Sequence, residues 1–194
     1  MFLIRKPSAF LIDTFISGER HRPFSYPEVG ATNGMLPPEY TVDRNRVVLG
    51  TGSETFHRAA ALLRNWQMFK LGWIDVFPTG APIKTGETVA VVVRHFGFWS
   101  LNACRIVYVF ESERTFGFAY GTLADHAEQG EERFSIDWSV EDDSVCYNIL
   151  AFSKPNKVAA RVMRPLSRVP QKKFARDSLA VMKSCSILPQ SFMT

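Results

Sequence analysis

Polar side chains interrupt the apolar faces of three consecutive strand-like segments. In the second segment, 115–123, one set of alternate residues is apolar and ends in Tyr120 and Thr122. In the third segment, 133–140, the corresponding set is preceded by Glu132 and is otherwise apolar. Arg105 alternates with aliphatic residues in the first segment. Because alternate residues of a strand point to one face, the expected registers place Thr122 opposite Glu132, Tyr120 opposite Phe134, and Arg105 opposite Tyr120 or Thr122. Arg105, Tyr120, Thr122 and Glu132 are therefore predicted to share one concave, aromatic-rich face.

An arginine and a carboxylate on an apolar face allow three kinds of chemistry. They can form a structural ion pair that fixes the sheet, since a buried charge is costly unless it is paired. They can orient a ligand, since apolar pockets carry few convergent polar groups. Glu132 can also act as an acid or base, because burial raises the pKa of a pocket carboxylate. The residues leave all three interpretations open.

His126 lies in the loop between the second and third segments. A histidine can act as a base or bind a metal at the mouth of a pocket, but one histidine without a second at ligand spacing favours a turn-stabilising role. We therefore expect no metal and no cofactor. Trp66 and Trp73 flank the end of a predicted helix, where they can wall a pocket or belong to the ordinary core. The candidate ligand-binding residues are Arg105, Tyr120, Thr122, His126, Glu132, Trp66 and Trp73.

Recognised catalytic motifs are absent from the sequence. There is no GxSxG nucleophile motif, and no cysteine has a histidine neighbour in a recognisable context. The segment Gly50–Thr55 precedes a helix but lacks the Gly-Lys-Ser/Thr ending of a P-loop, so it is interpreted as a helix start. These observations favour a binding protein over an enzyme.

The elements that position the candidate residues follow from hydrophobic periodicity and turn residues. A short amphipathic helix up to Gly18 is followed by an irregular segment, 19–43, that is rich in Pro, Gly and Asn. A first strand over 46–49 leads into a helix that ends near Gly72. Short connections between the later strands predict an antiparallel meander. Six strands are expected at 73–77, 88–96, 100–110, 115–123, 133–140 and 145–152, followed by a helical stretch over 156–183 that Pro165 and Pro170 divide or kink.

Composition limits the class of protein. The 194 residues are 46% hydrophobic and 22% charged, which fits one globular domain. The net charge is +4, but the basic residues are scattered, so no nucleic-acid partner is expected. No apolar run is long enough to span a membrane. Three cysteines without a CxxC spacing indicate a reducing compartment. We expect a cytoplasmic protein.

The order of elements resembles the helix-grip fold of START/SRPBCC-type proteins. Such an α+β domain has a curved antiparallel sheet, here of about seven strands, wrapped on a long C-terminal helix with an apolar cavity between them. The single expected domain comprises an N-terminal helix and irregular segment over 1–45, a helix-grip core over about 46–183, and a tail over 184–194.

Several short motifs also resemble the DUF1990 (UPF0548) family of uncharacterised proteins. The most distinctive are Ala119-Tyr120-Gly121-Thr122-Leu123 with His126, and Gly130-Glu131-Glu132-Arg133-Phe134. Others are Phe24-Ser25-Tyr26-Pro27 and Trp66-Gln67-Met68-Phe69. The resemblance extends from about Pro7 to Lys183, but the family implies no established substrate, cofactor or catalytic residue.

Three functions are compatible with this resemblance. The fold implies that a small apolar or amphipathic ligand binds between the C-terminal helix and the sheet. The alternative is an enzyme of the cyclase, hydrolase or lyase type that uses the same cavity, with Glu132, Tyr120 and His126 near the chemistry. In a third interpretation, the irregular segment 19–43 binds a protein partner.

Overall fold

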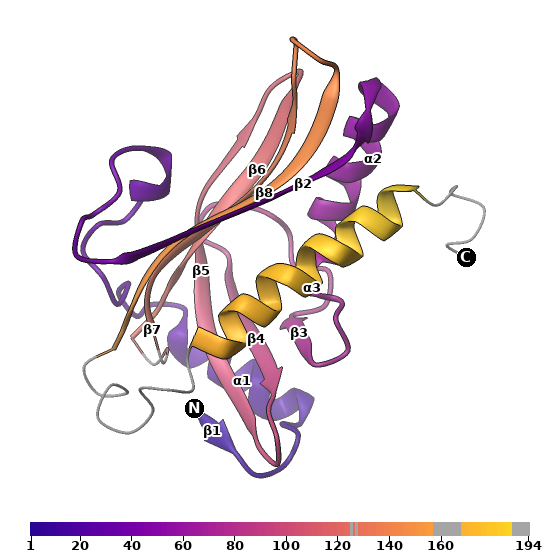
Figure 1. Ribbon diagram of the computed structural model, residues 1–194. Coiled ribbons are helices and arrows are strands. Elements are labelled where there is room, and N and C mark those ends of the chain that lie inside the picture. The colour runs from indigo at the N-terminus through magenta and orange to yellow at the C-terminus, as the bar shows by residue number, and fades with distance from the viewer. Residues whose placement is uncertain (125, 127, 157–167, 188–194) are drawn as a thin grey trace.

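The computed structural model describes residues 1–124, 126, 128–156 and 168–187 (Figure 1). Over these residues the chain forms a curved sheet with helices on both of its faces. The helices are α1 (Ala9–Glu19), α2 (Gly52–Arg64) and α3 (Arg168–Ile187), with short 3₁₀ turns at Ala31–Asn33 and Gln67–Phe69. The strands are β1 (Phe2–Leu3), β2 (Thr41–Thr51), β3 (Ile74–Phe77), β4 (Thr88–Arg94), β5 (Trp99–Glu111), β6 (Thr115–Thr122), β7 (Glu128–Trp138) and β8 (Ser144–Pro155).

The sheet is an antiparallel meander closed by one long crossover. Its strand order is β2-β8-β7-β6-β5-β4-β3, and β1 pairs with β5 outside this path. The strands from β3 to β8 lie side by side in chain order, as expected from their short connections. Along this path of the described strands, β2 is the one that joins out of chain order, beside β8. This curled sheet of seven strands with a C-terminal helix is the predicted helix-grip architecture.

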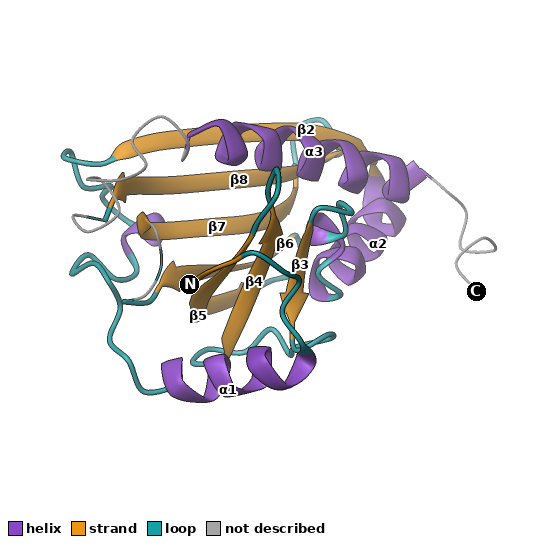
Figure 2. Ribbon diagram, turned by 90° about the horizontal axis from the view of Figure 1, so that it is seen from below, coloured by secondary structure: helices purple, strands orange, loops and turns teal. Residues whose placement is uncertain are grey.

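Helices cover the two faces of the sheet unequally. Figure 2 shows α2 and α3 on the concave side and α1 on the opposite side. The main core lies on the concave face, where Phe116, Phe118, Phe134 and Ile136 are fully buried. A smaller core forms where α1 packs on the outer faces of β4 and β5. The burial of large aromatic side chains makes the concave core the dominant source of stability.

Several element boundaries differ from the expectation, among them the start of β7, which is Glu128 instead of Arg133. β2 begins at Thr41 instead of Arg46. The earlier start was missed because this edge strand begins with mostly polar residues, among which Val42 alone is apolar, so it shows no hydrophobic alternation. α3 continues to Ile187, so the expected tail begins within the helix. Pro170 occupies the first turn of α3, where a missing amide donor costs little, whereas Pro165 and the rest of 157–167 lie outside the described residues.

No helix within the described residues has the length and apolar character needed to cross a bilayer.

Candidate functional site

A pocket of about 600 Å³ lies between α3 and the concave face of the sheet. Its position follows from the side chains on that face. Toward α2 the concave face carries large aromatic residues that fill the space, whereas toward the start of β2 it carries small or polar residues such as Gly130, Ala151 and Asn102. The apolar wall comprises Phe69, Trp73, Ile74, Val91, Ile149, Phe174 and Leu179. The polar lining includes Asn45, Asn102, Tyr120, Thr122, His126, Gln129, Glu132 and Gln171.

Tyr120 and Glu132 form the polar centre of this pocket. They are directly opposed on β6 and β7, and the Tyr120 hydroxyl donates to Oε2 of Glu132 at 2.8 Å. The pKa of Glu132 is raised to about 7, mainly by burial and also by the charges of Glu128 and Asp43, while the hydrogen bond from Tyr120 lowers it. Burial, with the neighbouring Glu132 charge, also raises the pKa of Tyr120 well above its ordinary value. Near neutral pH, Glu132 can therefore accept or donate a hydrogen bond.

Arg105 does not belong to this cluster, so the prediction that it shares a face with Glu132 is wrong, and the ion-pair interpretation fails with it. It pairs with Gly121 on β6, and it therefore lies on the outer face while Ile106 faces Tyr120. The cause is a β-bulge between Ile106 and Tyr108, which shifts the register by one residue. Such a slip moves every following side chain to the other face.

On the outer face, Arg105 holds the end of α1. Its Nη2 donates to the carbonyl oxygens of Glu19, Arg20 and Arg22 at 3.0, 2.7 and 2.9 Å. Its Nε donates to the Thr88 hydroxyl at 3.2 Å. A guanidinium at this position satisfies the carbonyls that a helix C-terminus leaves unpaired. Its role is structural.

Thr122 lines the pocket, but its hydroxyl is engaged by backbone and a neighbouring side chain. It accepts from the Gly130 N–H at 3.0 Å and lies 2.6 Å from the Ser25 hydroxyl. It does not oppose Glu132, because the loop is centred one residue earlier than expected and Glu132 pairs with Tyr120. Gly130 has a φ of 153° and no space for a Cβ, which would lie 2.0 Å from the Phe152 carbonyl oxygen.

His126 lies at the edge of the pocket within its turn. The Glu128 N–H donates to its Nδ1 at 3.0 Å, and the Asn156 side chain donates to its carbonyl oxygen at 3.2 Å. Burial lowers the pKa of His126 to about 4, so the imidazole is neutral near pH 7. Among the residues that the structure describes, no group of three His, Cys, Asp or Glu side chains is placed to hold a metal ion.

The two candidate tryptophans lie in different environments. Trp66 is buried in the core, where its indole N–H donates to the Ala81 carbonyl oxygen at 2.7 Å. It is not part of the pocket wall, unlike Trp73. The Trp73 indole donates to Oδ2 of Asp177 on α3 at 3.1 Å, and the Lys173 ammonium lies 3.8 Å from a Trp73 ring centroid. Trp73 therefore joins the wall of the pocket to the helix that covers it.

Glu131 is a buried carboxylate whose role the sequence reasoning missed. It is 2% exposed and lies on the outer face of β7. Its oxygens accept from the Tyr26 hydroxyl at 2.8 Å, from the backbone N–H groups of Gly30 and Thr32 at 2.7 and 3.0 Å, and from the Thr32 hydroxyl. The signal was present in the pair Glu131-Glu132, because adjacent strand residues must point to opposite faces.

These bonds tie part of the irregular segment 19–43 to the sheet. Tyr26, Tyr40 and Phe152 form a small core beneath it, with Tyr26 and Phe152 ring centroids 5.6 Å apart. Such packing weighs against the hypothesis that this segment is a free partner-binding arm.

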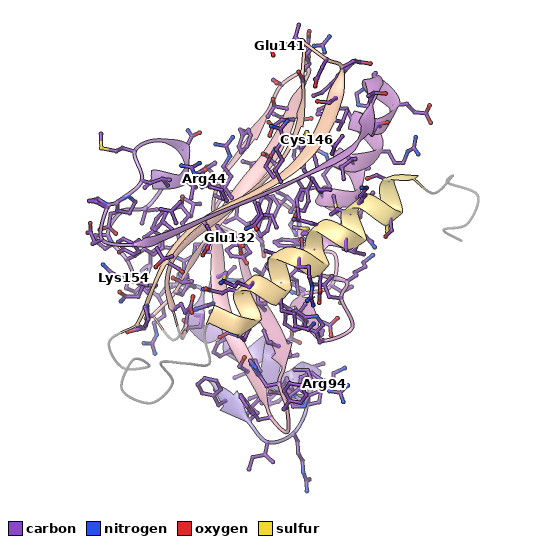
Figure 3. All side chains as sticks on the ribbon, in the orientation of Figure 1. Arg44, Arg94, Glu132, Glu141, Cys146 and Lys154 are labelled. Carbon is purple, nitrogen blue, oxygen red and sulfur yellow. The ribbon has the colours of Figure 1, made fainter. Side chains whose placement is uncertain are left out.

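Figure 3 shows Glu132 beside α3, in the middle of the sheet, and far from the loop that carries Glu141.

A second polar group at the pocket, which the sequence analysis also missed, lies near the β4–β5 hairpin. There the Ser100 hydroxyl lies 2.9 Å from Nε2 of His95 and accepts from the Asn102 amide at 3.0 Å. The alternation of Ser100 and Asn102 along β5 was the available signal.

Comparison with solved structures identifies the fold class of this chain. A hypothetical protein from Helicobacter pylori superposes with a TM-score of 0.54 at 13% identity, covering 84% of this chain and 96% of that one. Major latex-like protein 151 from Panax ginseng superposes with a TM-score of 0.51 at 11% identity, covering 77% of this chain and 99% of that one. The fold is therefore the helix-grip fold of Bet v1-like and START-like proteins.

Sequence comparison then places the chain within this class. The family model "Domain of unknown function (DUF1990)" matches residues 25–181. A UPF0548 protein from Dictyostelium discoideum is 37% identical over 199 residues, covering 92% of each chain. A UPF0548 protein from Deinococcus radiodurans is 34% identical over 189 residues, covering 91% of this chain and 94% of that protein. This chain belongs to the DUF1990, or UPF0548, family.

Proposed function

We propose that the pocket between α3 and the concave face binds a small apolar or amphipathic molecule. The observation that carries this proposal is the combination of a volume of about 600 Å³ with a few polar groups in a largely apolar, aromatic wall. Ligand pockets in proteins have volumes of about 300–1,000 Å³ and are mostly apolar with a few convergent polar groups. The Tyr120–Glu132 pair is such a polar group.

The arrangement of the wall separates a polar end from an apolar body. Tyr120 contacts the ring of Phe69, with centroids 6.1 Å apart, and Phe69 in turn contacts Phe174 on α3 at 4.8 Å. Ile149 lies two residues along β8 from Ala151, which opposes Glu132. A ligand with a polar head and an apolar body fits a pocket with one polar end and an apolar wall better than a uniformly polar ligand does.

The test is a titration with the neutral fluorescent probe N-phenyl-1-naphthylamine. Ala151→Phe introduces a large ring beside Glu132 and should weaken binding by about tenfold or more, because it occupies the pocket. Val48→Phe is the matched control, since Val48 is 50% exposed and points to the outer face. No saturable binding to wild type, or equal binding to folded Ala151→Phe, would contradict the proposal.

Acid or base catalysis in the same pocket is the second candidate function. It is favoured by the Glu132 carboxyl, whose pKa of about 7 lies near physiological pH beside the Tyr120 hydroxyl. Wild-type protein and Glu132→Gln are incubated with a small-molecule extract and the products compared by mass spectrometry. A product that forms only with wild type supports catalysis, whereas identical profiles count against it.

A further inference from the structure

Glu132 is an acidic group at the pocket without a basic partner in the part of the chain that the structure describes. The hydrogen bond from Tyr120 engages one of its two oxygens. The ion pairs over these residues all involve other carboxylates. A carboxylate has about four acceptor sites, so Glu132 keeps acceptor capacity for a molecule in the pocket.

Negative charge gathers at this end of the pocket. Asp43 on β2 and Glu128 on β7 also line it, and their charges act on Glu132. The basic side chains of the described lining, Lys172 and Arg176, come from α3 and are exposed to solvent. Arg176 also pairs with Asp177, at 2.9 Å. The positive side chains of the described lining thus lie at the outer rim, and the N-terminal ammonium acts on His126. The charges that act on Glu132 are those of the acidic residues Glu128 and Asp43.

An ammonium group matches these surroundings better than an anion or a neutral hydroxyl does. It supplies the hydrogen-bond donors and the counter-charge that a partly buried carboxylate needs. The Tyr120 hydroxyl contacts the carboxylate, and the Phe69 ring lies 6.1 Å from the Tyr120 ring, between centroids. Aromatic faces attract cations. A carboxylate ligand would instead place two like charges together at a desolvated site.

We propose that the pocket selects amphipathic amines, with the protonated amine paired to Glu132 and the apolar body against Phe69, Phe174 and Ile149. This inference rests on the proposed ligand-binding function. The amine donates to the free oxygen of Glu132, and Tyr120 keeps the carboxylate oriented. A charge-assisted hydrogen bond of this kind contributes about tenfold to a hundredfold in affinity.

The test compares three probes of equal length by displacement of N-phenyl-1-naphthylamine at pH 8. Decylamine, decanol and decanoate differ only in head group. Wild type should bind decylamine about tenfold or more tightly than decanol, and decanoate most weakly. Glu132→Gln should remove the preference for the amine over decanol. Glu141→Gln, which changes the net charge equally in a distant exposed loop (Figure 3), should keep it.

The outcomes separate this inference from the function on which it rests. If the three decyl probes bind wild type equally, or if Glu132→Gln keeps the amine preference, ligand binding stands and amine selection is wrong. Tighter binding of decanoate than of decylamine also overturns it. If neither the decyl probes nor N-phenyl-1-naphthylamine binds, the proposed function itself fails. The ranking on wild type needs no variant, so it holds as a test even if Glu132→Gln folds poorly.

Discussion

Replacing Glu132 by glutamine should stabilise the folded protein at alkaline pH. The pKa of Glu132 is about 7 in the folded state, against 4.5 for an unperturbed glutamate. Since one pKa unit corresponds to about 1.4 kcal/mol, this difference corresponds to about 3 kcal/mol of unfolding free energy. The side-chain amide of the Glu132→Gln variant is neutral at every pH, and its carbonyl oxygen can still accept the hydrogen bond from Tyr120.

The sign of the pH dependence follows from proton linkage. Below pH 4.5 the carboxyl is protonated in both states and carries no penalty. Between pH 4.5 and 7 the unfolded state ionises while the folded state keeps its proton, so wild type loses stability as pH rises. Above pH 7 the loss stays constant at about 3 kcal/mol. A bound amine would offset this penalty, because it stabilises the ionised carboxylate.

Urea unfolding of wild type and Glu132→Gln at pH 4, 5.5, 7 and 8.5 measures this effect. The stability difference between the two proteins should increase in favour of the variant by about 3 kcal/mol from pH 4 to 8.5. Glu141→Gln serves as the control, since its exposed carboxyl should leave the difference nearly flat. A flat difference for Glu132→Gln, or a wild type that gains on the variant as pH rises, would refute the reasoning.

Three further predictions concern groups around the pocket and on the outer face. Glu131→Gln should lower the unfolding free energy, measured in urea, by about 2–4 kcal/mol, because an amide NH₂ then faces buried donors. A loss below about 1 kcal/mol would show that the hydrogen bonds of Glu131 do not hold segment 19–43 on the sheet. Tyr120→Phe should raise the pKa of Glu132 above about 7, because it removes the hydrogen bond that lowers this pKa. A carbon-13 NMR titration of the Glu132 carboxyl measures the change. An unchanged titration midpoint would show that the Tyr120–Glu132 hydrogen bond is not formed. The His126 ring should titrate near pH 4 by NMR, and it should cost stability as pH falls from 6.5 toward 4; a midpoint near 6.5 would mean that the ring is solvated.

The sequence was sufficient for the fold because its periodicity and turns agree across the whole meander. The alternation in β6 and β7 correctly predicted that Tyr120 and Glu132 share one face. Glu132 pairs with Tyr120 instead of Thr122, but this shift of two residues keeps every side chain on its predicted face. β2 was predicted too short, because an edge strand with polar residues on both faces has no period-two signal.

The candidate site was less predictable because it depends on single-residue events. The β-bulge near Val107 places Arg105 on the outer face. No Gly or other residue typical of a bulge occurs at that point of the sequence, so the bulge could not be predicted. Trp66 and Trp73 are close in sequence, yet one is core and one is pocket wall, since the chain turns sharply at Trp66, where φ is 56°. The pocket itself depends on how closely α3 approaches the sheet, which is a property of tertiary packing.

The most direct test of ligand binding in this pocket is a methyl NMR titration with N-phenyl-1-naphthylamine. Val91, Ile149 and Leu179 line the pocket, whereas Val145 lies in the filled core and Val48 on the outer face. We predict saturable shifts at the methyl groups of the three pocket residues and little change at those of Val145 and Val48. Shifts confined to Val48, or none at the pocket residues at saturating probe, would contradict the account.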